Sequence, residues 1–362
     1  MDFMKKIIKK VLKNHKGLQN YIYTVYKEYR YTKSIFKTLI FAIKGLFLTY
    51  TPSYKINRGE QIKKSFSKAK INIDNDDNFV FSIDPYKLLY SDLSTIENTT
   101  IDYEICLNKS LNDLKKEIEN LKSGDYKNTQ LNAIEAIEIL LNKVIQSLKK
   151  SNKKNKKKYI KYFENIKDRK AESFEEALQR ILFYNQVLWQ SGHNLNGLGR
   201  LDKILDSYYK NDKKMDKEKA SKLIEKFIGT LHSYYWLKSS ALLGDTGQII
   251  ILGGMDEKKH YFSNDLTYIF VEVIKKLQLP DPKVLLRISK NTPRDLIKLS
   301  IDCIKTGVGC PLFANDDVII PKLIKFGYEK KDAYNYVTSA CWEPLIPNKS
   351  VEQNNIRSLV FM

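Results

Sequence analysis

Apolar residues recur every three or four positions in the middle of the first half of the chain, as they do along one face of an α-helix. The clearest stripe consists of Ile134, Ile137, Leu141, Val144 and Leu148. This spacing predicts helices over 107–150. The lysine-rich run that follows, 149–161, is predicted to be a solvated surface connection and a boundary between two regions.

After residue 170, short apolar runs alternate with helical patterns. Ser173, followed by Glu176, predicts a capping box that opens a helix. Strands are expected at 249–254, 284–289 and 311–315, and helices at about 216–238, 264–279, 292–307 and 317–327. Strands that alternate with helices of this length predict an α/β sheet or barrel, in which the chemistry usually lies on loops at strand ends.

The first 50 residues are strongly basic, with eleven Lys and Arg residues against two acidic ones, a net charge of +9. Their most apolar stretch, 36–50, is too short to span a bilayer and contains Lys44. It predicts an amphipathic helix. Such a helix can lie on anionic lipid, or it can pack on the core of the protein with its lysines in water, and we favour the second interpretation.

The whole chain of 362 residues carries 62 Lys and Arg against 42 Asp and Glu, a net charge of +20, and is 43% hydrophobic. This composition excludes disorder and a disulfide mini-scaffold. Lysine supplies most of the charge and is spread along the chain, whereas nucleic-acid recognition relies on arginine forks, so nucleic acid is not expected as a partner. The four Cys and four His residues show no zinc-ligand spacing, and no signal peptide is evident, so a reduced, cytoplasmic protein is expected.

The segment 332–350 contains the most reactive combination of residues. Tyr334, Tyr336 and Val337 predict a strand, and Pro344 then favours a loop that presents Cys341 and Glu343 together. A carboxylate raises the pKa of a neighbouring thiol, so this pair is poorly suited to a thiolate nucleophile. On spacing alone, a buried cysteine beside a solvent-facing glutamate is the simpler interpretation.

The order of five motifs in the chain favours a functional role for Cys341 and Glu343 over the simpler interpretation. The motifs are NGLGRLDKILDSYYKND (196–212), GGMD (253–256), NDLTYIFVEVIKKLQLPDPKVLLRIS (264–289), GVGCPLFANDD (307–317) and DAYNYVTSACWEP (332–344). Together they resemble the glycyl radical enzyme family, the pyruvate formate-lyase-like group. The resemblance is good over about 170–344, thinner over 50–170 and absent over 1–50.

The resemblance implies a barrel of two five-stranded halves with a cysteine loop inside it. It places Cys341 at the thiyl-radical position, where the cysteine reacts by hydrogen transfer, and Glu343 at the general-base position. The radical itself is stored on a glycine of a separate C-terminal loop. An iron–sulfur activating enzyme that uses S-adenosylmethionine installs it, and no cofactor is expected to bind this chain directly.

The sequence departs from the family pattern at three points. Ala340 stands where the family usually has glycine, and no second cysteine precedes Cys341, which disfavours formate C-acetyltransferase activity. The Cys-x-Glu form resembles the dehydratases and the C–N or C–O lyases. The sequence also ends at Met362 without the radical-glycine motif, so the second half-barrel and the glycine-radical domain are expected to be absent from it.

Other positions carry weaker hypotheses. Asn315 and Asp316 match a strand-end pair of the family that would line a substrate pocket, and the alternative for this pair is the N-cap of a helix over 317–326. His193 is a further candidate for substrate binding, with a structural role as the alternative. Cys310 is predicted to pack in the core, and the Gly253–Gly254 pair to form a strand-end turn.

The sequence thus predicts an α/β fold, an incomplete, half ten-stranded barrel preceded by helices. The expected regions are a basic segment (1–50), a mostly helical region (51–170) and the first part of the barrel (171–362). The expected function is thiyl-radical elimination, dehydration or lysis of a small hydroxylated substrate, in a homodimer when complete. The alternatives are an inactive remnant or interaction module at a membrane surface, and one chain of a split enzyme whose second chain carries the glycine.

Overall fold

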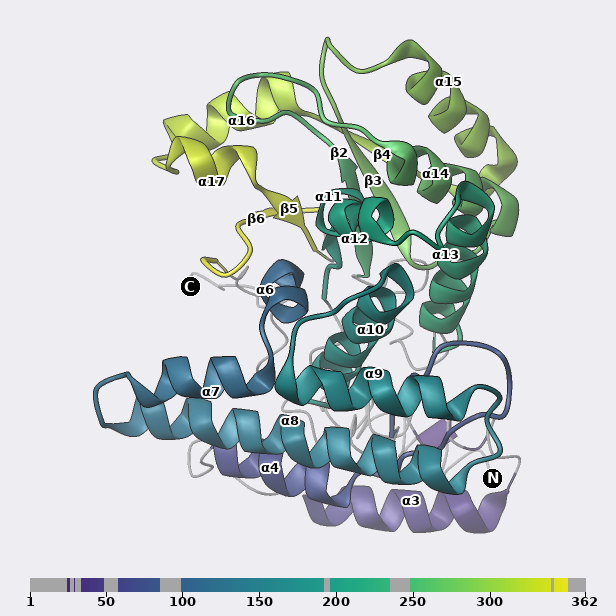
Figure 1. Cartoon of the computed structure of the whole chain (residues 1–362), viewed down its shortest axis with the longest axis vertical. Coiled ribbons are helices and arrows are strands. Elements are labelled where there is room, and N and C mark those ends of the chain that lie inside the picture. The colour runs from purple at the N-terminus through teal and green to yellow at the C-terminus, as the bar shows by residue number, and fades with distance from the viewer. Residues whose placement is uncertain are drawn as a thin grey trace, which may run out of the picture.

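The computed structural model describes residues 25–26, 29, 34–48, 58–84, 99–191, 196–234, 248–339 and 342–350. The helices before the first strand are α3 (Ile35–Leu48), α4 (Arg58–Lys68), α6 (Tyr103–Asn108), α7 (Leu111–Glu119), α8 (Asp125–Lys150), α9 (Lys156–Asp168) and α10 (Phe174–Gln190). Helices α4, α7, α8 and α9 lie side by side and form a helical layer, and α10 leads from this layer towards the sheet (Figure 1).

The apolar stripe of α8 faces this layer. Ile134, Leu141, Val144 and Leu148 are buried, as their spacing predicts. The lysine-rich connection is shorter than expected, because α9 begins at Lys156 and continues through the second half of the predicted loop.

One lysine of that connection is not solvated. Only 1% of the Lys153 side chain is exposed, and its ammonium donates to Asp76 Oδ1 at 2.9 Å and to the carbonyl oxygen of Asp74 at 3.3 Å. Lysine side chains are seldom fully buried unless a partner compensates their charge. The prediction of a wholly solvated run is therefore wrong for Lys153, which joins the connection between α8 and α9 to the segment 74–76.

Helix α10 begins at the predicted cap, but only half of the capping box forms. The Ser173 hydroxyl accepts from the backbone N–H of Glu176 at 3.3 Å. The Glu176 carboxylate is instead buried and accepts from Asn165 Nδ2 at 3.0 Å and from Arg180 Nη2 at 3.3 Å. A buried carboxylate needs charged or polar partners, and here α9 and α10 supply them.

Three glutamines of α10 hold an extended segment, 79–84, that the sequence pattern did not identify. Gln179 accepts from Val80 N and donates to Val80 O, both at 2.8 Å. Gln186 accepts from Ser82 N at 3.1 Å, and Gln190 accepts from Asp84 N at 2.9 Å. These side chains satisfy buried backbone groups in the way that a neighbouring strand would.

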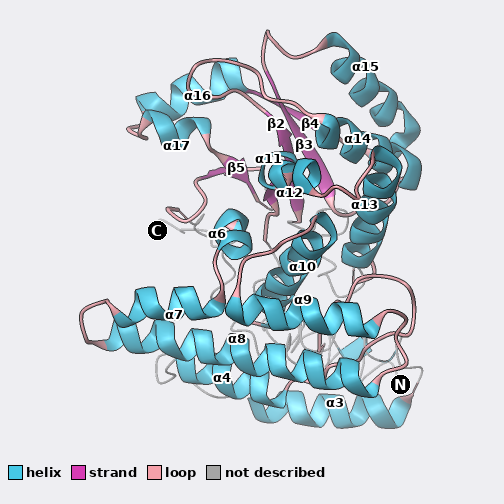
Figure 2. Ribbon diagram, in the orientation of Figure 1, coloured by secondary structure: helices cyan, strands magenta, loops and turns pink. Residues whose placement is uncertain are grey.

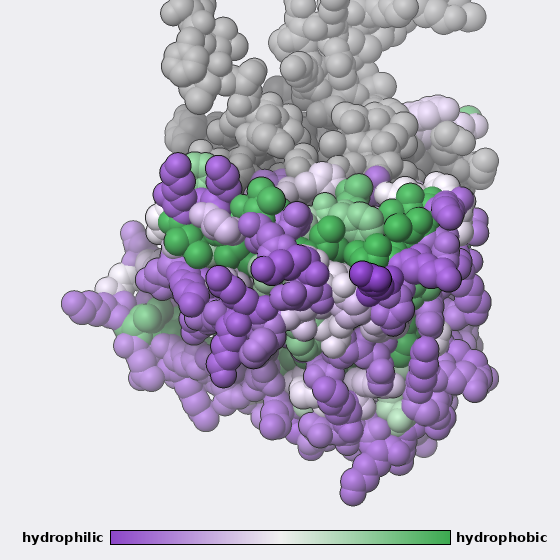
Figure 3. Space-filling view, turned by 90° about the horizontal axis from the view of Figure 1, so that it is seen from above, coloured by the Kyte–Doolittle hydropathy of each residue, from purple (hydrophilic) through white to green (hydrophobic). Residues whose placement is uncertain are grey.

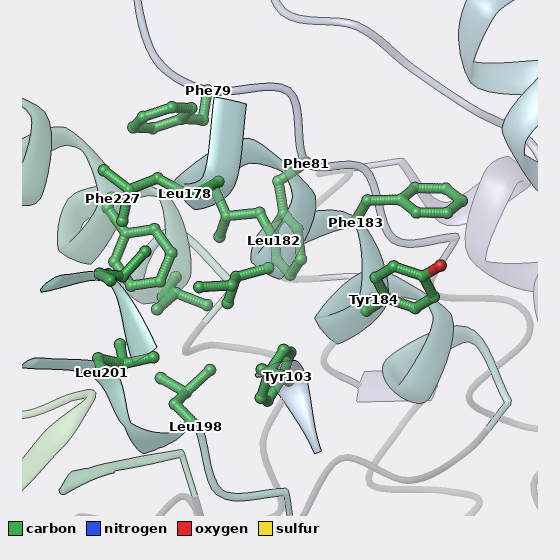
Figure 4. Close-up of a cluster of buried hydrophobic side chains, with 14 of the residues drawn as sticks. Phe79, Phe81, Tyr103, Leu178, Leu182, Phe183, Tyr184, Leu198, Leu201 and Phe227 are labelled. Atoms are coloured by element: carbon green, nitrogen blue, oxygen red, sulfur yellow. The ribbon is translucent and has the colours of Figure 1, made fainter. Parts of the chain in front are cut away.

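The main core lies where this segment, α6, α10 and α13 (Lys217–His232) meet. Figure 4 shows its buried side chains, among them Phe79, Phe81, Tyr103, Leu178, Leu182, Phe183, Leu198, Leu201 and Phe227. Phe163 and Phe183 stack edge to face with ring centroids 5.7 Å apart, an arrangement that aromatic quadrupoles favour. One core therefore joins the helical layer to the sheet.

The sheet has four parallel strands in the order β1 (Gly199–Arg200), β2 (Ile249–Gly253), β3 (Lys283–Ile288) and β4 (Leu312–Asn315). The three strands expected from the sequence are confirmed within one or two residues. Ile250 pairs with Val284, and Leu286 pairs with Phe313. The protein has an α/β fold with a parallel sheet and many helices.

The remaining helices are α11 (Leu201–Ile204), α12 (Asp206–Asn211), α13 (Lys217–His232), α14 (Asp265–Leu277), α15 (Arg294–Cys303), the π-helical turn η5 (Ile304–Val308), α16 (Asp316–Lys325) and α17 (Lys330–Tyr334). Helix α13 ends at His232, earlier than predicted. Tyr334 lies in α17 and not in the predicted strand. The chain then forms a two-stranded antiparallel hairpin, β5 (Val337–Thr338) and β6 (Pro344–Leu345).

The two faces of the sheet contact different elements, because successive side chains of a strand point to opposite sides. Ile250, Leu252, Val284 and Leu286 belong to the main core on the side of α13 and α14. Ile249, Ile251 and Leu285 pack against the hairpin on the other side. Figure 2 shows this arrangement, with the magenta strands between the cyan helices and the hairpin.

The surface agrees with the composition. The face in Figure 3 is mostly hydrophilic and carries a band of hydrophobic side chains.

Helix α3 is predicted to bury its apolar face, but four of its apolar side chains are largely exposed. Ile35, Phe36, Leu39 and Ile43 are 75%, 72%, 56% and 47% exposed. That prediction is wrong for these four side chains. No helix in the described part of the chain is long and apolar enough to cross a membrane.

Candidate functional site

The hairpin that carries the Cys-x-Glu motif lies against the face of the sheet that α13 and α14 leave uncovered. Val337 pairs with Leu345, and Thr338 pairs with Pro344. Val337 and Leu345 are buried against Ile251 and neighbouring residues of the sheet. The two strands on either side of the motif are therefore held against the sheet.

Hydrogen bonds fix the described residues that flank the tip. The Ser339 hydroxyl donates to the carbonyl oxygen of Thr99 at 3.0 Å, and the Thr100 hydroxyl donates to the carbonyl oxygen of Thr338 at 3.3 Å. The backbone N–H of Trp342 donates to the carbonyl oxygen of Ser339 at 2.8 Å. Trp342 has a φ of 70°, which is uncommon for a bulky residue. This conformation costs free energy and persists only where the surrounding structure enforces it.

A buried ion pair stands at the carboxyl ends of β3 and β4. Arg287 donates through Nε to Asp316 Oδ1 at 2.9 Å and through Nη2 to Asp316 Oδ2 at 2.8 Å, and both side chains have zero exposure. The carboxylate also accepts from the backbone N–H of Met255 at 2.7 Å and from the Tyr336 hydroxyl at 2.8 Å. Burial raises the pKa of Tyr336, so the phenol stays protonated and donates.

A second pair of charges lies at the ends of β1 and β2. Arg200 Nη2 donates to the carbonyl oxygen of Gly253 at 2.7 Å, and Asp202 Oδ2 accepts from the backbone N–H of Gly253 at 2.7 Å and from the Thr267 hydroxyl at 2.8 Å. Burial, and then the nearby charge of Arg287, lower the pKa of Arg200 to about 10. Burial raises the pKa of Asp202. The carboxyl ends of the strands thus hold two buried arginines and two buried aspartates, Arg200, Arg287, Asp202 and Asp316, whose charges offset one another.

The turn after β2 needs its two glycines for a steric reason. Gly253 and Gly254 have φ values of +65° and +110°. A Cβ on Gly254 would meet Arg287 Nε at 2.8 Å, and a Cβ on Gly253 would meet the Tyr261 hydroxyl at 2.4 Å. The predicted strand-end turn is confirmed, and it also makes room for the guanidinium of Arg287.

The predicted site residues have different outcomes. Glu343 is described and partly exposed, next to Trp342 at the hairpin tip. Cys341, Ala340 and His193 lie outside the described residues. The proposed roles of Cys341, Glu343 and His193 stay predictions.

Asn315 and Asp316 have structural roles. Asn315 Oδ1 accepts from the backbone N–H of Asp317 at 3.0 Å, so Asn315 is the N-cap of α16, as the alternative interpretation held. Asp316 has zero exposure and already accepts four hydrogen bonds. Contact of either residue with substrate stays a prediction. Cys310 is buried as predicted, and burial raises the pKa of its thiol.

The sequence pattern did not identify four residues as parts of the site: Arg287, Tyr336, Arg200 and Asp202. One signal for Arg287 was available, because it interrupts the apolar run of a strand that is buried in a parallel sheet, and a buried charge needs a partner. Nothing in the sequence pattern names that partner. Asp316 comes from the end of the next strand, and Tyr336 from the segment that enters the hairpin.

A parallel sheet with helices on one side and a Cys-x-Glu hairpin on the other is the arrangement expected of glycyl radical enzymes. The model of the pyruvate formate lyase-like family matches residues 90–358. The chain belongs to this family. Its relatives include glycyl radical dehydratases and lyases.

Individual comparisons agree on the class. The chain is 30% identical over 206 residues to the probable dehydratase YbiW of Escherichia coli, in a match that covers 51% of this chain and 24% of the relative. It is 24% identical over 287 residues to an isethionate sulfite-lyase of Desulfovibrio desulfuricans, with 68% of this chain and 34% of the relative covered. The matches thus span about a quarter to a third of these curated relatives.

Solved structures show the same fold. The B12-independent glycerol dehydratase of Clostridium butyricum matches with a TM-score of 0.62 at 21% identity, over 83% of this chain and 39% of that structure. A structure concerned with 1,2-propanediol dehydration in Roseburia inulinivorans matches with a TM-score of 0.61 at 26% identity, over 86% and 41%. The fold is similar to that of glycyl radical enzymes.

Proposed function

We propose that this chain is part of a glycyl radical enzyme that eliminates water or another leaving group from a small hydroxylated substrate. The observation that carries the proposal is the hairpin of β5 and β6, which packs on the free face of a parallel sheet and whose two strands flank the Cys-x-Glu motif in the sequence. The relatives named as dehydratases and sulfite-lyases support an elimination.

In the proposed reaction, the Cys341 thiyl radical takes a hydrogen atom from a carbon of the substrate, which breaks a C–H bond and forms an S–H bond. Glu343 accepts the proton of the hydroxyl on that carbon, and the leaving group on the adjacent carbon departs with its bonding electron pair. The product radical then takes a hydrogen atom back from the Cys341 thiol. A proton acceptor of this kind contributes about 10²–10⁴-fold to the rate.

The rest of the enzyme is part of the same proposal. The sheet forms the first half of a ten-stranded barrel, after an N-terminal helical region, and the radical glycine comes from sequence outside these 362 residues, in the same polypeptide or in a second chain. A radical-SAM activating enzyme installs the radical. The complete enzyme is a cytoplasmic homodimer.

The substrate class follows from the motif and from the relatives. Ala340 leaves Cys341 without a paired cysteine, which disfavours formate C-acetyltransferase activity. Relatives are named for the dehydration of trans-4-hydroxy-L-proline and of (2S)-3-sulfopropanediol and for the lysis of isethionate. Glycerol and 1,2-propanediol appear in the descriptions of the matching structures. All five compounds carry a hydroxyl group, and we propose a small alcohol of this kind.

The test starts with the protein isolated anaerobically from its source with whatever co-purifies, and measures its intact mass. A mass above 42.3 kDa, or a stoichiometric partner that carries the radical glycine, agrees with the proposal. A chain of 42.3 kDa with no such partner makes it a remnant. The activated preparation is then assayed by electron paramagnetic resonance and with the five hydroxylated compounds.

Site variants of the activated enzyme test the two roles. We expect Cys341→Ala to abolish turnover, while Cys303→Ala, a change at the buried last residue of α15, keeps it. Glu343→Gln is expected to lower kcat by about 10²-fold or more, with substrate binding kept. Undiminished turnover in Cys341→Ala sinks the thiyl assignment, and undiminished turnover in Glu343→Gln sinks the proton-acceptor role.

A second function is favoured by the exposed apolar side chains of α3 together with the net charge of +9 over residues 1–50. An amphipathic basic segment binds anionic lipid through both features. We propose that residues 1–50 of this chain form a module that binds anionic lipid surfaces. Flotation with anionic vesicles, with neutral vesicles as the control, tests it. Equal recovery of the intact chain and of a chain that lacks residues 1–50 contradicts it.

A further inference from the structure

Arg287 makes more contacts than its ion pair with Asp316 requires. Beside its two bonds to the carboxylate, Nη1 donates to the carbonyl oxygen of Tyr336 at 3.0 Å, and Nη2 donates to the carbonyl oxygen of Tyr334 at 3.1 Å. The guanidinium also stacks over the Tyr336 ring at 4.0 Å from its centroid. One side chain of β3 therefore binds the segment that leads into the hairpin at two backbone positions.

Asp316 binds the same segment from α16. Its carboxylate accepts from the Tyr336 hydroxyl at 2.8 Å, so Tyr336 is bound by its ring, its carbonyl oxygen and its hydroxyl. Tyr336 is buried and directly precedes β5. The three residues, which we call the hairpin clamp, join β3, α16 and the start of the hairpin.

A clamp at this place solves a problem of register. Each strand of the hairpin has only two residues, and a slip of one residue would turn every side chain of a strand to the opposite face. Such a short hairpin fixes its own register weakly. Directional bonds to Tyr334 and Tyr336 fix the chain one residue before β5 begins and so determine which side chains of the hairpin face the sheet.

Burial alone does not explain this choice of residues. A hydrophobic trio of similar volume often stabilises a core as well as a buried ion pair does. Hydrophobic packing would, however, lack the directional bonds that single out the two carbonyl oxygens. The ion pair is thus better explained by what it positions than by the stability that it adds.

We propose that Arg287, Asp316 and Tyr336 are positioning residues that hold the Cys341–Glu343 tip in its reactive place. The inference rests on the proposed function for its catalytic part, and it assigns the three residues a role in positioning and no contact with the reacting atoms. It gives Asp316 a positioning role, while contact of Asp316 with substrate stays a separate prediction. A misplacement of about 1 Å can cost on the order of 10²-fold in rate, so a loosened clamp lowers kcat.

The main test is Tyr336→Phe in the native, full-length protein. This change keeps the ring and removes one hydroxyl. Tyr334→Phe is the matched control, because Tyr334 contributes its carbonyl oxygen to the clamp and its ring lies in the adjacent apolar cluster. Arg287→Lys is a second variant, because it keeps the charge but loses the planar fork that reaches four acceptors.

Hydrogen exchange followed by mass spectrometry measures the clamp without any catalysis. We expect the amides of peptides covering 337–345 to exchange about fivefold or more faster in Tyr336→Phe, as the loss of one buried hydrogen bond predicts. Those of α8 are expected to be unchanged, and Tyr334→Phe is expected to match the wild type. Unchanged exchange at 337–345 in both Tyr336→Phe and Arg287→Lys would overturn the proposal.

Steady-state kinetics of the activated enzyme measures the consequence. We expect kcat to fall on the order of tenfold to a hundredfold, with KM nearly constant. Faster exchange with an undiminished kcat overturns the positioning role, as does a rise in KM alone. If the activated wild type converts none of the candidate substrates, the proposed function fails, and the exchange measurement still decides whether the three residues fix the hairpin.

Discussion

The helical layer and the sheet region place charge differently. In the layer, the ion pairs lie mostly at the surface, as in Lys109–Glu117 with side chains 37% and 56% exposed. At the strand ends, Arg287 and Asp316 have zero exposure. The helical layer is held mainly by apolar stripes, and its buried Lys153 pairs with a half-exposed Asp76. At the strand ends, both partners of the ion pair are fully desolvated, and Arg287 also binds the segment that enters the hairpin. The buried pair indicates that the position of the hairpin segment on the sheet is specified by directional bonds, in addition to being stabilised by apolar packing.

The largest expected effect comes from breaking the buried pair. Asp316→Ala leaves the Arg287 guanidinium as an uncompensated buried charge, and we expect it to lower the free energy of unfolding by about 3–5 kcal/mol. Glu117→Ala, which breaks the exposed pair with Lys109, is expected to cost less than about 1 kcal/mol. Chemical denaturation of both variants makes the comparison, and similar losses would contradict the distinction between the two regions.

A smaller effect is expected from the glycine turn. Gly254→Ala combines an unfavourable φ of +110° with a contact of 2.8 Å to Arg287 Nε, and we expect a loss of about 1–3 kcal/mol. Gly124→Ala in the helical layer is the matched control, since Gly124 also has a positive φ, +148°, but no atom lies within 4 Å of an added Cβ. Thermal unfolding compares the two. A larger loss at Gly124 than at Gly254 would show that backbone strain, and not the close approach to Arg287, requires the glycine.

The smallest of the three effects concerns the buried lysine of the helical layer. Lys153→Met removes its bonds to Asp76, whose own side chain is 43% exposed, so the loss at neutral pH is expected to be about 1–2 kcal/mol. Burial tends to raise the pKa of Asp76, but the hydrogen bonds from Lys153 and Asn78 lower it overall below 3.8.

The sign of the pH dependence follows from this shift. A carboxyl whose pKa is lowered by folding stabilises the folded state above its unfolded pKa, and that stability is lost as the pH falls through the folded pKa. The difference between wild type and Lys153→Met should therefore shrink below about pH 4. Denaturation at several pH values checks this, with Asp76→Asn as the control that removes the titration. A difference that grows on acidification contradicts the assignment.

Much of the fold follows from periodicity. Each of these elements could be predicted from residues that are close to one another in the sequence: the apolar stripe of α8, the strands at 249–253, 283–288 and 312–315, and the helix that begins after Ser173. The α13 end and the position of Tyr334 were mispredicted, because a local pattern does not contain the contacts that end an element. Lys153 was mispredicted because its acceptors lie almost eighty residues earlier in the chain.

The candidate site divides in the same way. The Cys-x-Glu motif is a feature of spacing along the chain, and so the sequence could propose it. The family, the α/β class and the cap at Asn315 were likewise within reach of local patterns. The hairpin clamp could not be predicted from local patterns, because its three residues come from β3, from α16 and from the segment before β5.

Most helices and strands, the family and the residues proposed for chemistry can be inferred from the sequence, because they depend on neighbours in the chain and on the order of motifs. The three-dimensional arrangement was needed to show that Asp316 is the buried partner of Arg287, that two glycines make room for the guanidinium and that the hairpin lies on the free face of the sheet. The physical reason is that desolvation and hydrogen-bond geometry depend on which distant side chains surround a group, and a sequence pattern does not contain that information.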